Sequence, residues 1–150
     1  MTKQTDGQQF AISGLQKKVL FVIGACEKAG NPPTLTLLNK IFYFIDFGTY
    51  AKHEKTITGS SYIKLQFGPV LFGLNDILDS LIQKEKLSIS KVKGGFEKEH
   101  SVYNANKQLN PQDLGLNEDE LEIIYKTVNE FAGKTARNAS RESHFHYSWI

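Results

Sequence analysis

The fold of this chain is decided by residues 38–70, LNKIFYFIDFGTYAKHEKTITGSSYIKLQFGPV. The first part of this stretch is apolar almost all round, a pattern typical of a helix buried at the centre of a domain. One stripe differs, because four polar or aromatic residues recur at i, i+4, i+7 and i+11 and therefore share a face: Asn39, Tyr43, Asp46 and Tyr50. Side chains on this stripe must be hydrogen-bonded inside the protein or face a partner.

Capping signals and apolar periodicity predict the elements on either side of this stretch. Ser13 followed by Gln16 predicts a capping box, and Gly30 a helix end. The expected elements are a helix over 14–29, a helix capped by Thr34 and reaching about Ala51, a strand over 62–67, a helix opened by Gly68 and Pro69 and ending near Lys86, strands over 87–92 and 100–105, a helix capped by Asn117 and ended by Gly133, and a helix from Thr135 to about Ser143. The fold class is therefore α+β, mainly α: a compact helical domain with a small antiparallel β-sheet or hairpin.

The composition is that of an ordinary soluble globular protein. The 150 residues are 40% hydrophobic and 23% charged, and 18 basic against 16 acidic residues leave a net charge of +2. This charge is too small to indicate nucleic acid or an anionic membrane as a partner. Arg137 and Arg141 are the only arginines. A nucleic-acid role is weakened further, since arginine is the preferred residue for bidentate phosphate and guanine contacts.

The sequence predicts a cytoplasmic protein. Residues 1–9 are polar and lack the apolar core of a signal peptide, and the longest apolar run, 19–26, is far too short to span a membrane. Cys26 is the single cysteine, so no intrachain disulfide can form. We expect a flexible N-terminus over residues 1–12 and one domain over 13–150.

No part of the sequence predicts an active site. Cys26 lies on the apolar stripe of its helix and is expected in the core, and Asp46 has no nucleophile or base near it in the sequence. His144 and His146 with Glu142 are too few for a metal site, and neither HExxH nor CxxC is present. The phosphate-binding patterns GxxxxGK(S/T) and GxGxxG are absent as well. We therefore expect no enzyme activity, no cofactor and no bound metal.

Two other functions stay open at this point. A helix followed by a two-stranded hairpin, after earlier helices, is the order found in winged-helix DNA-binding transcriptional regulators. Here the helix before the hairpin carries Asp76 and Asp79 and no basic residue before Lys84. That is a poor design for DNA, because phosphate contacts dominate affinity. The other alternative is a metal-dependent hydrolase that uses the terminal histidines.

Several short motifs, in their order and spacing, resemble one family. Residues 38–46, LNKIFYFID, resemble the LxKLLYxxD signature of the SocA-type antitoxin domain, also called Panacea. Residues 57–59 resemble its ITG turn, and residues 67–70 its YGPV motif. Ser143 and His144 with Trp149 resemble its (S/T)HxxxxW pattern. Ile41 and Phe42 replace the usual pair of leucines, a conservative packing change.

The resemblance implies a protein-binding antitoxin of bacteria or phages, which neutralises a co-encoded toxin by direct interaction and without catalysis. The implied partner is a protein, the cognate toxin, with no membrane, no nucleic acid and no cofactor involved. The motif residues, with a structural or a partner-binding role, are Lys40, Tyr43, Asp46, Thr58, Gly59, Gly68, Pro69, Val70, His144 and Trp149. Of these, His144 and Trp149 are expected to pin the C-terminal segment against the centre of the domain.

We interpret the motif residues as mainly fold-keeping, in preference to a direct binding role, because core motifs usually report packing. Asp46 is expected to accept hydrogen bonds from the turn at Thr58 and Gly59, which would hold the long helix to the strand. Gly68 is expected to turn the chain from strand to helix, and Pro69 to determine the helix start. The partner-facing residues are then expected on other surfaces.

Overall fold

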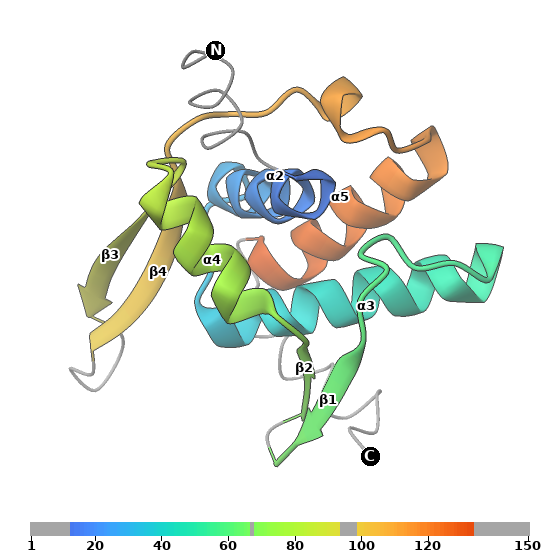
Figure 1. Ribbon diagram of the computed structural model, residues 1–150, viewed down its shortest axis with the longest axis horizontal. Helices are drawn as coiled ribbons and strands as arrows, with labels where there is room; N and C mark the ends of the chain where they lie inside the picture. Colours follow the sequence, from blue (N-terminus) through green and yellow to red (C-terminus); the bar gives the residue numbers. More distant parts are fainter. Residues whose placement is uncertain (1–12, 67, 94–98, 134–150) are drawn as a thin grey trace, which may run out of the picture.

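The computed structural model describes residues 13–66, 68–93 and 99–133. The elements are α2 (Gly14–Lys28), α3 (Leu35–His53), β1 (Tyr62–Leu65), β2 (Gly68–Leu71), α4 (Leu74–Gln83), β3 (Leu87–Lys93), β4 (Glu99–Ala105), the 3-10 helix η2 (Pro111–Leu114) and α5 (Glu118–Ala132). Figure 1 shows α2, α3 and α5 packed together, with β3–β4 at one side and β1–β2 projecting from α3. The predicted fold class, α+β and mainly α, is confirmed, with two small antiparallel sheets.

The core lies where α2, α3 and α5 meet, and α4 covers one side of it (Figure 1). On α3, Leu38, Ile41 and Phe42 are buried completely or almost so. Phe44 of the same helix stacks on Phe131 of α5, with ring centroids 5.0 Å apart and an interplanar angle of 11°. Large apolar side chains of this kind supply most of the favourable free energy of folding.

The starts of α2, α3 and α5 lie where the capping signals predict them. The Ser13 hydroxyl accepts a hydrogen bond from the Gln16 N–H, and the Gln16 side chain accepts one from the Ser13 N–H. Thr34 caps α3, and Asn117 caps α5. None of the helices in the described part of the chain is long and apolar enough to cross a membrane.

α3 is less completely buried than its apolar sequence predicts. Phe47 is 55% exposed, and Tyr50 is 59% exposed. On the polar-aromatic stripe, Asn39 and Asp46 are buried whereas Tyr50 faces solvent. One part of the stripe is therefore buried and hydrogen-bonded, and another part is exposed. The sequence had left both outcomes open.

The prediction that Gly68 and Pro69 open a helix is wrong. Both belong to strand β2, which pairs antiparallel with β1 so that Leu65 faces Gly68 and Lys64 faces Pro69. The helix α4 begins only at Leu74. Glycine is still required, because Gly68 has a φ of +117°, a conformation that L side chains rarely adopt.

The register explains why a proline fits in this strand. Phe72 N–H donates to the Ser61 carbonyl, at 2.8 Å, so residues 68, 70 and 72 direct their backbone groups toward β1. Residues 69 and 71 then direct theirs away from it, where Pro69 needs no N–H and Leu71 N–H donates to Asn39 Oδ1 at 2.9 Å. In the sequence, proline at an outward strand position looks the same as proline in a first helical turn.

The second hairpin, β3–β4, is confirmed, and each of its strands is one residue longer than predicted. Its register pairs Leu87 with Ala105 and Val92 with His100. The segment 106–116, the connector between β4 and α5, contains the short helix η2. The predicted flexible residues 1–12 and the predicted helix from Thr135 lie outside the described residues.

Replacing Asn39 by alanine should weaken the attachment of β2 to α3. The buried N–H of Leu71 would lose its acceptor, and an unsatisfied buried donor costs about 1–3 kcal/mol. Urea denaturation of Asn39→Ala and of the wild type measures this loss. Thr36→Ala, at an exposed position of the same helix, should stay within about 0.5 kcal/mol of the wild type. Equal stability of Asn39→Ala and wild type would show that this bond does not hold the hairpin.

Candidate functional site

A buried carboxylate on α3 gathers the loop after that helix and the start of β1. Asp46 is only 3% exposed. Its Oδ1 accepts hydrogen bonds from the N–H groups of Ile57 (2.9 Å) and Thr58 (3.1 Å). Its Oδ2 accepts from the hydroxyls of Thr58 (2.6 Å) and Tyr62 (2.6 Å). These donors offset the high cost of removing a carboxylate from water.

The expected contact between Asp46 and the turn at Thr58 is confirmed, since Thr58 donates through both its backbone and its hydroxyl. Gly59 is not a donor to Asp46, because its N–H bonds to the Thr56 hydroxyl at 3.0 Å. The motif also does not predict that the N–H of Ile57 donates directly to Asp46. The loop after α3 is therefore held by more of its backbone than the sequence predicts.

Tyr62, the first residue of β1, is a part of this site that the sequence did not single out. Burial, followed by the charge of Asp46, raises the pKa of the Tyr62 hydroxyl, so the hydroxyl stays protonated and donates to Asp46. Its ring packs edge to face on Tyr43, with centroids 5.6 Å apart. Tyr43 in turn stacks on Phe47, with centroids 6.2 Å apart. We call Tyr43, Asp46, Ile57, Thr58 and Tyr62 the Asp46 cluster.

Four further motif residues line a cleft between α3 and the β1–β2 hairpin. Lys40, Gly68, Pro69 and Val70 all border it, and its volume is about 260 Å³. Burial lowers the pKa of the Lys40 ammonium. Leu65 of β1 lines the same cleft. Residues that are far apart in the sequence are thus brought together at one surface opening.

The side of the β1–β2 hairpin opposite to the buried Leu71 is apolar. Ile63, Leu65, Val70 and Phe72 share it, because side chains alternate along a strand and Ile63 pairs with Val70. Ile63 is 45% exposed, Leu65 53% and Phe72 63%. We call these four residues the hairpin surface. Of these four residues, only Val70 was among those predicted from the sequence. Ile63 and Leu65 could have been noticed, because apolar residues at alternate positions of a strand indicate one apolar face.

The helix that would read DNA in a winged-helix protein has an acidic surface. α4 precedes the hairpin β3–β4, and its Asp76 and Asp79 are exposed. Like charges would face the phosphates in such a complex. The geometry gives the DNA-binding alternative no support.

The described residues offer little to catalysis or metal binding. Cys26 is completely buried, as expected, and burial together with the neighbouring Glu27 carboxylate raises the pKa of its thiol to about 12. Within residues 13–66, 68–93 and 99–133, no three His, Cys, Asp or Glu side chains group as metal ligands. His144 and Trp149 lie outside the described residues, as do Glu142 and His146.

A family model described as "Antitoxin SocA-like, Panacea domain" matches residues 38–150. This match includes the Asp46 cluster, the hairpin surface and most of the residues that line the cleft. No curated protein and no solved structure matches the chain.

Replacing Asp46 by asparagine should destabilise the protein by about 2–4 kcal/mol. The amide keeps one acceptor oxygen, and its NH2 group meets donors that have lost their acceptor. Tyr62→Phe removes one donor only and should cost about 1–2 kcal/mol. Denaturation in urea measures both values. Asp79→Asn, at an exposed position, is the matched control, and equal stability of Asp46→Asn and this control would contradict the structural role.

The Cys26 thiol should resist labelling in the folded protein. At pH 8 a thiol with a pKa of about 12 is almost entirely protonated, and burial blocks access as well. Reaction with a thiol-specific chromogenic disulfide should be at least about a hundredfold slower than that of free glutathione, and should become fast in denaturant. Labelling of the native protein at the glutathione rate would show that Cys26 is accessible.

Proposed function

Because the chain belongs to the SocA-like Panacea domain family, we propose that it is an antitoxin that neutralises a co-encoded toxin by direct contact. In this proposal, residues 13–150 form one cytoplasmic, non-catalytic binding domain. The observation that carries the proposal is the exposed apolar hairpin surface next to the cleft at Lys40.

The hairpin surface has the chemistry of a docking site. Contiguous exposed apolar side chains on a folded domain mark protein-interaction sites more often than isolated ones do. Phe72 is the most exposed of the four, and aromatic side chains are enriched among the residues that dominate binding energy. Covering a side chain such as Phe72 or Leu65 removes apolar area worth about 1.5–3 kcal/mol. The matching toxin surface is then expected to be apolar as well.

The rest of the motif supports this surface by holding it in place. The Asp46 cluster attaches the start of β1 to α3, and Asn39 attaches β2 to the same helix. A preformed surface loses less conformational entropy on binding than a flexible one. We therefore assign Tyr43, Asp46 and Thr58 to maintaining the fold, and Lys40 and Val70, which line the cleft, to contact with the toxin.

Co-expression with the product of the neighbouring gene tests the proposal. We expect the wild-type protein to restore growth of cells that make the toxin and to co-purify with it. The double variant Leu65→Glu, Phe72→Glu should lose the rescue and weaken binding by at least about a hundredfold, because two charges would enter the apolar interface. Both side chains are largely exposed, so the fold should tolerate the change.

The matched control is Ile89→Glu, at a 49% exposed position on β3 of the other hairpin. This variant should rescue growth and bind like the wild type. Rescue by the double variant, or loss of rescue in the control alone, would contradict the assigned surface. Specific binding to its own promoter, lost steeply with added salt, together with failure to bind the neighbouring protein, would replace the antitoxin function with DNA binding.

A further inference from the structure

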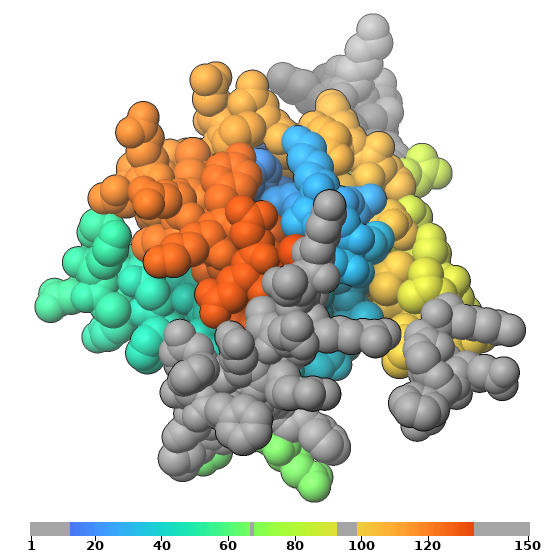
Figure 2. Space-filling model, turned by 180° about the vertical axis from the view of Figure 1, so that it is seen from behind, coloured from blue at the N-terminus to red at the C-terminus, as the bar shows by residue number. Residues whose placement is uncertain are grey.

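A second opening lies between α2, α5 and the connector after β4, away from the hairpin surface. In Figure 1 the connector crosses one end of the molecule and β1–β2 projects from the other. Seen from behind in Figure 2, α2 and the loop after it reach the surface between α5 and the side of β3 and β4. The cavity has a volume of about 160 Å³. None of the motif residues in the described part of the chain lines it.

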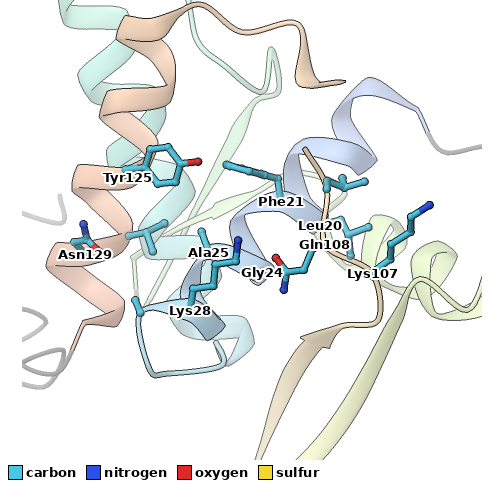
Figure 3. Close-up of a pocket in the computed structure, with 12 residues that line it drawn as sticks. Leu20, Phe21, Gly24, Ala25, Lys28, Lys107, Gln108, Tyr125 and Asn129 are labelled. Atoms are coloured by element: carbon cyan, nitrogen blue, oxygen red, sulfur yellow. The ribbon is translucent and has the colours of Figure 1, made fainter. Parts of the chain in front are cut away.

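The floor of this cavity is apolar. Leu20, Phe21 and Ala25 of α2, shown in Figure 3, line it together with Val128 of α5. Phe21 also packs edge to face against Tyr125, with ring centroids 5.8 Å apart, so two aromatic rings line the cavity. A ligand group seated here would leave water for an apolar surrounding, which favours carbon-rich groups.

Gly24 keeps the floor open where the connector crosses α2. Glycine in the middle of a helix lowers the helix stability by about 1 kcal/mol relative to alanine. Gly24 is nevertheless buried inside α2, so we expect the missing side chain to make room for a neighbouring group. A Cβ atom at this position would lie 3.3 Å from Gln108 Oε1 and 3.8 Å from the Ala105 Cβ. The missing side chain therefore lets the Gln108 amide lie over the floor.

The rim of the cavity is polar and positively charged. Lys28 and Lys107 contribute two ammonium groups, and Gln108 and Asn129 contribute two amides. Figure 3 shows Lys28 extending across the mouth on the side of Gln108, whereas Lys107 extends away from it. Among the described residues that line the cavity, none is an aspartate or a glutamate. The electrostatic complement of this rim is an anion.

We propose that this cavity binds a small carboxylic acid whose body is the size of one aromatic ring. An apolar cavity of about 150 Å³ is large enough to take up benzene, so the ring fits the floor. The carboxylate then meets Lys28, with a hydrogen bond from the Gln108 amide, and Lys107 adds positive charge to the mouth. Inorganic anions such as phosphate would leave the floor empty, and an uncharged ring would leave the cations unpaired.

The same chemistry occurs in two sources, a free aromatic acid and a peptide that ends in phenylalanine with a free carboxylate. Phenylacetate and N-acetyl-Ala-Phe serve as the two probes, titrated into the full chain and followed by amide shifts in NMR spectra. Phenylacetate should shift the signals of Gly24, Ala25 and Gln108 saturably, with a Kd on the order of 0.1 to 1 mM, the range for so few atoms. Tighter binding of the peptide would identify a chain terminus as the ligand, and tighter binding of phenylacetate a free acid.

Ligand controls separate the parts of the site. Acetate lacks the ring, phenylacetamide lacks the charge, and phosphate lacks the ring but carries charge. Each should bind at least about ten times more weakly than phenylacetate, which corresponds to 1.4 kcal/mol. Equal binding of phenylacetamide would contradict the role of the cationic rim, and equal binding of acetate would contradict the role of the floor.

Two variants test the assigned residues. Lys28→Gln should weaken phenylacetate binding about tenfold, whereas Lys126→Gln, an exposed lysine on α5 outside the cavity, should leave it unchanged. Gly24→Ala displaces the end of the flexible Gln108 side chain and narrows the floor, so it should weaken binding without lowering the melting temperature. Absence of saturable shifts with either probe, or full binding by Lys28→Gln, would overturn the proposal. Neither result depends on whether the protein binds a toxin.

Discussion

The arrangement of the motif region depends on one buried carboxylate. Asp46 stands on a helix surrounded by apolar side chains, and a charge in such a place is tolerated only when its oxygens are occupied by donors. The donors come from residues 57, 58 and 62, which follow the helix in the sequence. Meeting this requirement brings the loop back onto α3 and determines where β1 begins. The need of one buried carboxylate for hydrogen-bond donors thus determines where the β1–β2 hairpin lies.

A second polar side chain on α3 completes the attachment. Asn39 lies two helical turns before Asp46 and accepts the outward N–H of Leu71, so one helix face holds both strands of the hairpin. A two-stranded hairpin alone is marginally stable in water, and these anchors supply what its own ladder lacks. With Leu71 turned to the core, the alternation of the strands places Ile63 and Leu65 on the outside. The attachment of the hairpin and its exposed apolar surface therefore have the same cause.

The cleft beside Lys40 and the cavity at Gly24 differ in chemistry. The cleft beside Lys40 continues into an exposed apolar surface, which suits contact with another protein. The cavity at Gly24 is smaller and has an aromatic floor under a rim with Lys28 and Lys107, which suits a compact anion. They lie at different ends of the fold, so a change at one leaves the other intact. Only the first is built from the family motif.

The sequence by itself determined the starts of α2, α3 and α5, the second hairpin and the contact of Asp46 with Thr58, because capping, periodicity and an unpaired polar residue are local signals. The sequence also indicated the family, because its short motifs are recognised from their order and spacing along the chain. Only the tertiary structure decided that Gly68 and Pro69 form a strand, since the outward direction of the residue 69 nitrogen depends on pairing with β1. The donor role of Tyr62 and the approach of Gln108 to Gly24 were decided in the same way. Such contacts join segments that the chain separates, and no local pattern of residues encodes which of them will meet.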